Sequence, residues 1–388
     1  MPSTFGEALS VTIFGQSHSA AIGCVVEGLP SGFHLDLEAL QAFMARRAPG
    51  QGSWTTPRKE ADLVNVLSGL NPRGATCGAP LAMVIENTNT RRGDYDNVLA
   101  VPRPGHADFP AWATWHGNQD VPGGGHFSGR LTAPICAAGG VALQMLAASG
   151  VRVAAHLLRV GKATDEPFDA LSLDEAARAQ LAQQMGALGA PGRFPTIGKA
   201  AGQAMLAEID AARRDLDSVG GAVECVATGM PAGVGSPHFC GVENLIARAA
   251  FGIPAVKAIE FGRGAEVAGL RGSEDNDPYE MRDGRPCPVT NNAGGILGGI
   301  TTGAPVLFRV ALKPTPSISR PQRSVDLTRG EDSTLEVRGR HDPCVATRAV
   351  PVVEAACALA LLDAWLAFPP EGQPFRLPGQ AVAHTTPA

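Results

Sequence analysis

Apolar residues along the chain gather into short strand-like runs and a few longer helical ones, separated by turns rich in glycine and proline. The runs 11–14, 76–86 and 151–161 have the length and composition of β-strands. Longer apolar segments at 134–150 and 351–367 have the length of buried helices. This mixture predicts an α+β protein in which helices pack against antiparallel sheets.

Two stretches of the chain repeat the same pattern in the same order. Residues 17–32 match 218–233, and both predict an apolar strand that ends in a G-x-P-x-G turn. The further matching pairs are 37–48 with 242–252, 76–86 with 301–313, and 134–150 with 351–367. The repeat predicts two similar halves, about 1–150 and 215–367, within one domain that covers 1–367.

The segment 151–214 connects the two halves and has a different pattern. Its Ser172-Leu173-Asp174-Glu175 sequence is a capping-box pattern, which predicts the start of an alanine-rich helix. Another helix is expected around 198–214. The tail, 368–388, is rich in proline, glutamine and threonine, which predicts a poorly ordered segment.

Composition narrows the class of protein. Of the 388 residues, 44% are hydrophobic and 18% charged, as in a globular protein, and the net charge of −5 argues against a nucleic-acid binder. The apolar stretch 349–367 is long enough to raise the question of a membrane span. It contains Pro351, Glu354 and Asp363, and charges at membrane depth are costly, so a buried core helix is predicted and no membrane partner.

The spacing of the cysteines and histidines bears on the cellular compartment of the protein and on whether it has a metal site. The eight cysteines show no CxxC spacing and lie mostly among small apolar residues, so no disulfide framework is expected and the cytoplasm is the predicted location. The N-terminal residues lack the basic and apolar regions of a secretory signal. The nine histidines show no HExxH or paired-ligand spacing, so no metal site is predicted.

Two short, turn-rich tracts each hold an arginine, a histidine and an aspartate within six residues. They are RPGHAD at 103–108 and GRHDPC at 339–344. Guanidinium groups bind phosphate and carboxylate through paired donors, and histidine titrates near neutral pH. Each tract is therefore either an anion site with proton-transfer groups beside it or a surface turn with local ion pairs.

Two further segments near the N-terminus carry candidate chemistry. The sequence GQSHS at 15–19 places His18 after an apolar strand, where the imidazole either meets a ligand or caps a turn. The basic run 46–60 is either a lid over an anionic ligand or a solvated charged loop.

Two glycine-rich segments also suit an anionic or flat ligand. GGGHFSGRLT at 123–132 precedes a long apolar helix, so its backbone N–H groups and Arg130 can face an anion. The run 291–299 supplies glycines for close approach of a flat ligand, and 313–317 supplies lysine, threonine and serine for a phosphate; ordinary turns between strands use such glycines too. No nucleotide P-loop, Rossmann glycine motif or G-x-S-x-G elbow occurs.

Taken together, eight ordered blocks resemble chorismate synthase. The blocks are GQSHS at 15–19, RRAPG at 46–50, TTPRKEAD at 55–62, RPGHAD at 103–108, the GGG…S-G-R-x-T run at 123–132, NNAGGILGGI at 291–300, KPTPSI at 313–318 and GRHDPC at 339–344. The resemblance implies a shikimate-pathway enzyme of aromatic amino acid biosynthesis. Its reaction is a 1,4-anti elimination of phosphate from 5-enolpyruvylshikimate 3-phosphate to give chorismate, redox-neutral overall yet dependent on reduced FMN (FMNH2).

The resemblance also implies a fold and an assembly. The family fold is a three-layer β-α-β sandwich, with helices between two antiparallel four-stranded sheets and an internal pseudo-twofold repeat. The implied assembly is a homotetramer. This fold agrees with the two matching halves of the sequence.

Roles follow by position within the matching blocks. The resemblance implies that His18 assists the departing phosphate as an acid, that His106 protonates or stabilises the reduced flavin, and that Asp342 takes part with the flavin in removing the C6 proton. The implied substrate-binding residues are Ser17, Arg47, Arg103, Arg130 and Arg340. The implied FMN-binding residues are His126, Phe127, Ser128, Ala255, Gly298, Lys313, Pro314, Thr315, Pro316, Ser317 and Arg340. Arg47 is also the residue implied for NADP, and either NADPH or an external flavin reductase would supply electrons.

The chain departs from the family pattern at several positions. Gln16 and Ser19 replace Glu and Gly, His126-Phe127 replaces Arg-Ser, Leu131 replaces Glu, and Ser53 stands where a lid arginine is expected. These departures change one cationic flavin contact and weaken the NADP assignment, whereas His18, His106 and Asp342 are all in place.

Two other functions stay open at this level. One is an FMN-dependent reductase that uses NADPH on an anionic substrate, and it would consume NADPH stoichiometrically. The other is a catalytically inactive flavin- or phosphate-binding protein, which the intact His18, His106 and Asp342 argue against.

Overall fold

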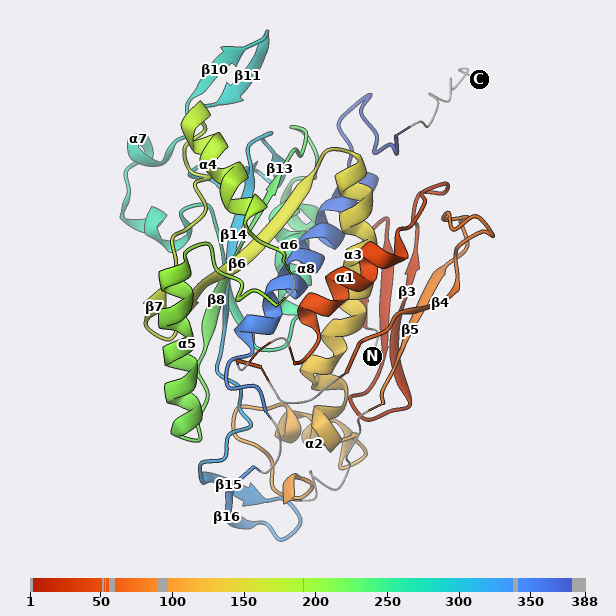
Figure 1. The fold of residues 1–388 in the computed structure, drawn as a ribbon, viewed down its shortest axis with the longest axis vertical. Coiled ribbons are helices and arrows are strands. Elements are labelled where there is room, and N and C mark those ends of the chain that lie inside the picture. Colours follow the sequence, from red (N-terminus) through yellow and green to blue (C-terminus); the bar gives the residue numbers. More distant parts are fainter. Residues whose placement is uncertain are drawn as a thin grey trace.

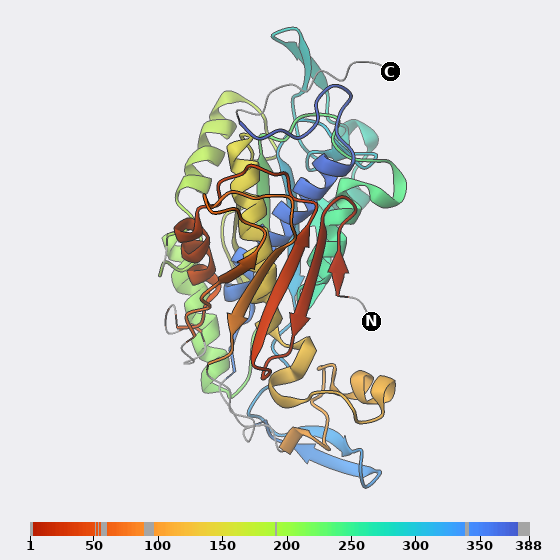
Figure 2. The same ribbon diagram turned by 90° about the vertical axis from the view of Figure 1, so that its right-hand side faces the viewer.

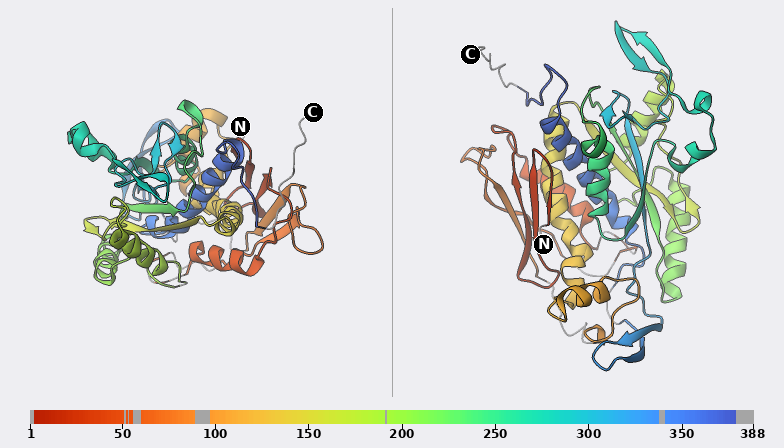
Figure 3. Two further views of the ribbon diagram at one scale, coloured as in Figure 1. Left: turned by 90° about the horizontal axis from the view of Figure 1, so that it is seen from above. Right: turned by 180° about the vertical axis from the view of Figure 1, so that it is seen from behind.

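The computed structural model describes residues 3–50, 52, 54–55, 60–88, 97–190, 192–337 and 341–378. Two antiparallel sheets face each other across the long helices α3 (Thr132–Ala148) and α8 (Ala346–Ala367), as Figure 1 shows. Helix α3 contacts the first sheet, α8 contacts the second, and the two helices pack on each other. The view from above in Figure 3 shows the same layers, and Figure 2 shows the first sheet face on.

The first sheet is built from the N-terminal half. Its strand order is β1 (Thr4–Phe5), β2 (Ser10–Gly15), β3 (Ala21–Glu27), β5 (Leu81–Glu86) and β4 (Asn65–Ser68). Alternate residues of β3 and β5, including Ile22, Cys24, Leu81 and Met83, are buried against α3 because successive side chains of a strand point to opposite faces.

The second sheet has the strand order β7 (Ala163–Thr164), β6 (Arg152–Val160), β8 (Gly221–Thr228), β14 (Val306–Leu312) and β9 (Val256–Phe261). Each sheet therefore contains five strands, and the prediction of four was wrong. Both sheets have a short edge strand, β1 or β7, of two residues each, and so short a run has no apolar periodicity to detect.

Two of the remaining helices pack on the central pair, and two lie over the second sheet. Helix α1 (Leu37–Arg47) contacts α3 and α8, while α6 (Val242–Phe251) contacts α8 and β9. Helices α4 (Glu175–Gly186) and α5 (Lys199–Arg214) lie over the outer face of the second sheet. The other elements are α2 (Asp108–Trp115), α7 (Gly272–Asp275) and the hairpins β10 (Tyr279–Arg282)–β11 (Arg285–Pro288), β12 (Ile296–Leu297)–β13 (Ile300–Thr301) and β15 (Gln322–Asp326)–β16 (Glu331–Leu335).

Helices α1, α3, α4, α5, α6 and α8 occur where the sequence predicts them, whereas α2 and α7 were not predicted. Three of the predicted helices differ at their starts, and α3 begins two residues before the predicted 134, at Thr132. Helix α8 begins five residues before the predicted 351, at Ala346. The cap of α4 is Asp174 rather than Ser172: the Asp174 carboxylate accepts a hydrogen bond from the Ala177 N–H at 2.8 Å. Ser172 instead donates its hydroxyl to that carboxylate at 2.9 Å, which holds the cap in place.

Helix α8 is the centre of the core. It and the segment Pro122–Ala148 are long and apolar enough to cross a membrane, but 89% of the α8 window is buried inside the protein, which confirms the prediction of a core helix. Its two acidic residues are both bonded: Glu354 pairs with Arg46 at 2.6 Å, and Asp363 accepts the N–H groups of Glu7, Ala8 and Leu9 at 2.8–3.0 Å. Such partners satisfy charges that burial would otherwise penalise.

The first part of the C-terminal tail packs onto helix α8. The Phe375 ring lies 5.2 Å from that of Trp365, and Leu377 is 5% exposed. The part of the predicted disordered tail from 368 to 378 is therefore ordered, because it carries two apolar anchors that its overall composition conceals. Residues 379–388 lie outside the described part of the chain.

The matched segments of the two halves make the same hydrogen bonds. The buried Thr76 hydroxyl donates to the Pro30 carbonyl at 2.7 Å, and the buried Thr301 hydroxyl donates to the Pro231 carbonyl at 2.6 Å. Each hydroxyl also accepts a backbone N–H at 3.0 Å, from Phe33 or Val234. The G-x-P-x-G turn after β3 and the one after β8 are thus tied to the next turn of the sheet in the same way.

These threonines give a stability prediction. We expect Thr76→Val and Thr301→Val each to lower the free energy of unfolding by about 1–3 kcal/mol, because each change removes the partner of one backbone N–H and one carbonyl that are buried or partly buried. Thr→Ser at the same positions keeps the hydroxyl and should cost less. Urea unfolding of the four variants measures the difference, and equal stability of the Val and Ser variants would contradict the assignment.

Candidate active site

A cavity of about 690 Å³ lies at the ends of the core elements, where loops of both halves meet. Its walls come from 103–107 before α2, 123–130 before α3, 251–257 between α6 and β9, 313–317 after β14, and 341–348 at the start of α8. Most residues implied by the resemblance line it. These are Arg47, Arg103, His106, His126, Phe127, Ser128, Arg130, Ala255, Lys313, Thr315, Pro316, Ser317 and Asp342.

The other implied residues are placed differently. Ser17 and His18 lie behind Gly123, and Pro314 does not line the cavity although its neighbours do. Gly298 stands in the β12–β13 hairpin, away from the cavity. Arg340 lies outside the described residues, as does Ser53.

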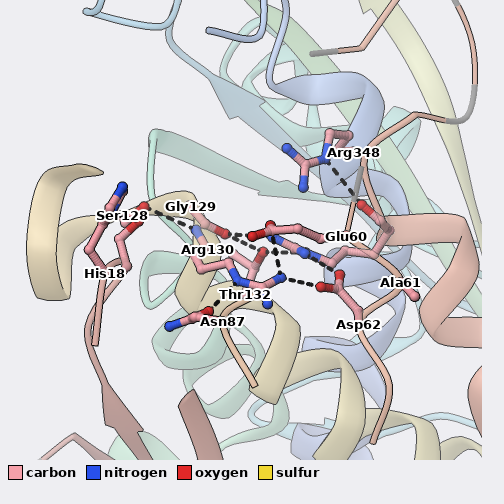
Figure 4. Close-up of polar contacts among 12 residues, drawn as sticks. His18, Glu60, Ala61, Asp62, Asn87, Ser128, Gly129, Arg130, Thr132 and Arg348 are labelled. Carbon is pink, nitrogen blue, oxygen red and sulfur yellow. Dashed lines mark hydrogen bonds and ion pairs between the residues drawn. The ribbon is translucent and has the colours of Figure 1, made fainter. Parts of the chain in front are cut away.

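The glycine run 123–125 forms the partition between His18 and the cavity. His18 is 5% exposed, and its Nδ1 lies 3.2 Å from the Ser17 hydroxyl. All three glycines have positive φ, and a Cβ added at Gly123 would lie 2.3 Å from His18 Nδ1. Only glycine permits this contact between the run and the imidazole. Figure 4 shows His18 beside Ser128, which follows the run.

This partition gives a second prediction. We expect Gly123→Ala to displace His18 and to lower the free energy of unfolding by about 1–3 kcal/mol, since alanine at φ 64° is strained and its methyl group meets the ring. Gly129→Ala is the matched control, because a Cβ there meets no atom within 4 Å. Thermal unfolding compares the two, and an equal melting temperature for both variants would show that the contact is unimportant.

His106 belongs to a hydrogen-bonded group with Arg103 and Asp108. His106 Nδ1 lies 2.6 Å from Asp108 Oδ1, and the same carboxylate accepts from Arg103 Nε at 2.7 Å and Nη2 at 2.8 Å. Burial alone would raise the pKa of Asp108, but the hydrogen bonds from Arg103 and His106 outweigh it and hold that pKa far below its usual range. The carboxylate therefore stays ionised and fixes the proton of His106 on Nδ1, so that Nε2 is the proton-accepting atom.

Arg47 and Arg130 share the carboxylate of Asp62 in the wall of the cavity. Arg47 Nη1 lies 2.5 Å from Asp62 Oδ2, and Arg130 Nη1 donates to Asp62 Oδ1. Figure 4 shows the guanidinium group of Arg130 pointing toward the carboxylate of Asp62. Burial favours a higher pKa for Asp62, but the two guanidinium groups outweigh it and lower that pKa. Burial also lowers the pKa of Arg47, and the nearby cations Arg348 and Arg130 add to that effect against the attraction of Asp62.

Asp342 is held by an arginine that the sequence analysis did not single out. Arg348 Nη1 donates to Asp342 Oδ2 at 2.7 Å, and Arg348 Nε donates to the Arg47 carbonyl at 3.1 Å. Burial favours a lower pKa for Arg348, but the ion pair with Asp342 outweighs it and raises that pKa. Asp342 thus faces the cavity beside a permanent cation.

Two lysines and an aromatic ring also line the cavity. Lys313 donates its ammonium group to the Gly105 carbonyl, and burial together with the neighbouring Lys257 lowers its pKa. Phe127 is 37% exposed and lies 5.9 Å from the Trp115 ring. His126 bonds to Ser3 Oγ at 2.8 Å and to the Gly15 carbonyl at 3.1 Å, which ties the cavity wall to the N-terminal strands.

Several residues of the site were missed from the sequence. Asp62 and Asp108 stand in quoted blocks and Arg348 follows GRHDPC by four residues, whereas Lys257 lies far from every quoted block. The only signal in the sequence for such residues is a charge close to a motif. The residues with which they form ion pairs are brought together only by folding. Among the described residues, no group of three or more His, Cys, Asp or Glu is arranged to hold a metal.

Comparisons with known proteins agree on one family. Residues 9–366 match the family model described as chorismate synthase. A chorismate synthase of Lancefieldella parvula is 52% identical over 96% of this chain and 98% of its own length. One from Methanocella arvoryzae is 46% identical over 93% of each chain, and one from Thermococcus kodakarensis is 44% identical over 92% of this chain and 96% of its own. A crystal structure of chorismate synthase superposes with a TM-score of 0.69 at 24% identity, covering 93% of this chain and 92% of that one, which supports the fold alone.

Proposed function

The chain belongs to the chorismate synthase family, whose members are lyases acting on phosphates, and we propose that the cavity binds 5-enolpyruvylshikimate 3-phosphate together with reduced FMN. The observation that carries the proposal is the meeting of Arg47, Arg130, His106 and Asp342, from four distant segments, around one cavity of about 690 Å³. The reaction is the 1,4-anti elimination of phosphate to give chorismate, within the shikimate pathway to aromatic amino acids.

The arginines suit a substrate with a phosphate and two carboxylates. Arg47 and Arg130 line the cavity from one side and Arg348 from the side of Asp342. Guanidinium groups bind such oxyanions through two parallel donors, and their burial strengthens the attraction because water screens it less. Arg340 is proposed as a further substrate and flavin contact on the strength of the family pattern. Arg103 spends its donors on Asp108 and Ser317, so we propose that it orients His106 as well as adding positive charge.

Two groups face the cavity with the chemistry for proton transfer. Asp342 accepts the proton from substrate C6, with Arg348 fixing its carboxylate. His106 holds or accepts a proton at Nε2, because its Nδ1 is committed to Asp108. His18, behind the glycine run, is proposed as the acid for the departing phosphate. General acid–base catalysis of this kind requires each group within hydrogen-bond reach of its proton.

The residues present fit a flavin mononucleotide. Lys313, Lys257, Thr315 and Ser317 supply cationic and hydroxyl donors for a phosphate, and Phe127 offers an apolar ring for a flat ligand. His126, Ser128, Ala255 and Pro316 complete this wall, and Pro314 adjoins it. When bound, reduced flavin would supply transient electron density to the substrate. Electrons would come either from NADPH, with Arg47 as its proposed contact, or from an external flavin reductase.

The architecture and assembly are proposed on the same basis. A three-layer β-α-β sandwich with a pseudo-twofold repeat is supported by the matching bonds of Thr76 and Thr301, and a single domain over 1–367 by one buried cluster that spans both sheets. A homotetramer is supported by apolar side chains at the surface around Gly298, with Phe239 92% and Leu297 48% exposed. A cytoplasmic location is supported by eight cysteines that all stand unbridged.

An anaerobic assay tests the function. With pre-reduced FMN, we expect the protein to release inorganic phosphate from the substrate and to form the conjugated diene of chorismate, followed by absorbance. Oxidised FMN with NADPH then shows whether the protein reduces its own flavin. Stoichiometric consumption of NADPH without phosphate release would favour the FMN-dependent reductase instead.

A further inference from the structure

Two buried arginines share one buried carboxylate at the wall of the cavity. Arg47 is 2% exposed, Arg130 is 8% exposed, and the Asp62 side chain is fully buried. Each oxygen of Asp62 accepts one guanidinium, Oδ2 from Arg47 and Oδ1 from Arg130. We propose that Asp62 is a positioning residue that holds Arg47 and Arg130 in the orientation needed to bind the substrate's anionic groups. The inference rests on the proposed function and goes beyond it, since Asp62 carries no role there.

Asp62 is itself fixed to the helix that carries Arg47. Gln41, on α1, donates its side-chain amide to the carbonyls of Ala61 and Asp62 at 3.2 and 3.3 Å. The Gln41 carbonyl oxygen accepts the Val64 N–H at 3.2 Å. Asp62 also has a φ of 49°, a left-handed conformation that aspartate adopts more readily than most residues. The carboxylate is therefore part of a docked segment and acts as a rigid support.

The two guanidinium groups are held on their other sides as well. Arg47 donates from Nε to Thr132 Oγ1 at 3.1 Å and from Nη2 to the Gly129 carbonyl at 3.2 Å. Arg130 donates from Nε to Asn87 Oδ1 at 3.0 Å. Long side chains fixed before the ligand arrives lose little freedom on binding, so a preorganised pair binds an anion more tightly than a mobile one.

The charge balance explains why the support is an acid. Arg130 and Arg348 lie close enough to Arg47 for their positive charges to repel it, which lowers the pKa of Arg47. One carboxylate between two guanidinium groups reduces that repulsion, and the Glu60 carboxylate, 3.5 Å from Arg130 Nη1, adds to the effect. If Asp62 only competed with the substrate, neutralising it would tighten anion binding; if it positions the arginines, neutralising it weakens binding.

The test compares Asp62→Asn with a matched control. Glu354→Gln is the control, because Glu354 pairs with Arg46, the neighbour of Arg47 on α1, at 2.6 Å and does not line this cavity. We expect Asp62→Asn to weaken the binding of inorganic phosphate, measured by calorimetry on the full chain, by about tenfold and to raise KM by a similar factor with a smaller effect on kcat. Glu354→Gln is expected to lower the melting temperature and to leave the phosphate affinity unchanged.

Several outcomes would overturn the inference. One is that Asp62→Asn binds phosphate as tightly as the wild type or more tightly. Another is that the wild type binds no phosphate. If Asp62→Asn does not fold, Gln41→Ala loosens the same segment and is expected to weaken phosphate binding about threefold; unchanged binding would overturn the inference too. Failure of the wild type to release phosphate from the substrate would instead contradict the proposed function, which the binding measurement does not depend on.

Discussion

Replacing His106 by alanine is expected to lower kcat by about a hundredfold to ten-thousandfold, the range that a positioned acid–base group contributes. The reason is the geometry of its ring: Nδ1 is committed to Asp108 at 2.6 Å, which leaves Nε2 to exchange a proton in the cavity. Flavin binding should be retained, because Lys313, Thr315 and Ser317 line the same cavity from another segment. Turnover with pre-reduced FMN and the dissociation constant of FMN, measured in parallel, separate the two effects.

His116→Asn is the matched control for His106→Ala. His116 is an exposed histidine at the end of α2, the helix that begins at Asp108, and its φ of 52° suits asparagine. The control should keep wild-type turnover. Unchanged turnover in His106→Ala, with circular dichroism like that of the wild type, would remove His106 from the mechanism.

The largest expected loss of stability comes from a buried network in the second sheet. His156 is fully buried, with Nδ1 3.1 Å from Asp165 Oδ2 and Nε2 3.1 Å from Glu224 Oε2. Glu224 also accepts from Arg309 Nε at 2.8 Å. His156→Ala removes the cation between two buried carboxylates, so we expect the free energy of unfolding to fall by about 3–5 kcal/mol in urea unfolding at pH 6.

The same network makes stability depend on pH. Burial favours a lower pKa for His156, but the hydrogen bonds with Asp165 and Glu224 outweigh it and raise that pKa. The folded protein therefore holds this proton more tightly than the unfolded chain, whose histidine has a pKa of about 6.5. The stabilisation is fully present below that value and declines as the pH rises through the folded pKa.

The pH dependence distinguishes the network from an ordinary loss of packing. We expect the stability gap between wild type and His156→Ala to shrink between neutral and alkaline pH. Arg213→Ala, at the exposed Arg213–Asp210 pair with 43% and 55% of the side chains accessible, should cost under about 1 kcal/mol at every pH. A gap that stays constant with pH would show that His156 is neutral in the folded protein.

The long elements of the fold could be predicted because each has a pattern of its own. The apolar run of α8 exceeds the length of any strand, and the matching G-x-P-x-G turns identify β3 and β8 as equivalent. The edge strands β1 and β7 could not be predicted, because each is two residues long and exists only through pairing with a neighbour. The ordered start of the tail depends likewise on Phe375 meeting Trp365.

Some residues of the site could likewise be predicted from the sequence, and others could not. His106, Arg130 and Asp342 stand in recognisable blocks, and the fold brings them to one cavity. Asp62 and Arg348 were missed because their importance lies in the residues that they contact. Asp62 contacts Arg130, which is distant in sequence, and Arg348 contacts Asp342 through a loop whose conformation the sequence does not reveal. Gly298 was implied as a flavin contact, and its place in the β12–β13 hairpin lies outside the cavity of its own chain.

The stoichiometry of turnover tests the central claim most directly. Under anaerobic conditions, a sub-stoichiometric amount of pre-reduced FMN and an excess of 5-enolpyruvylshikimate 3-phosphate are mixed with the protein, and phosphate, chorismate and reduced flavin are measured together. The account predicts many equivalents of phosphate and chorismate for each flavin, in a one-to-one ratio, with the flavin still reduced at the end. Product limited to one equivalent for each flavin, with the flavin left oxidised, would contradict it.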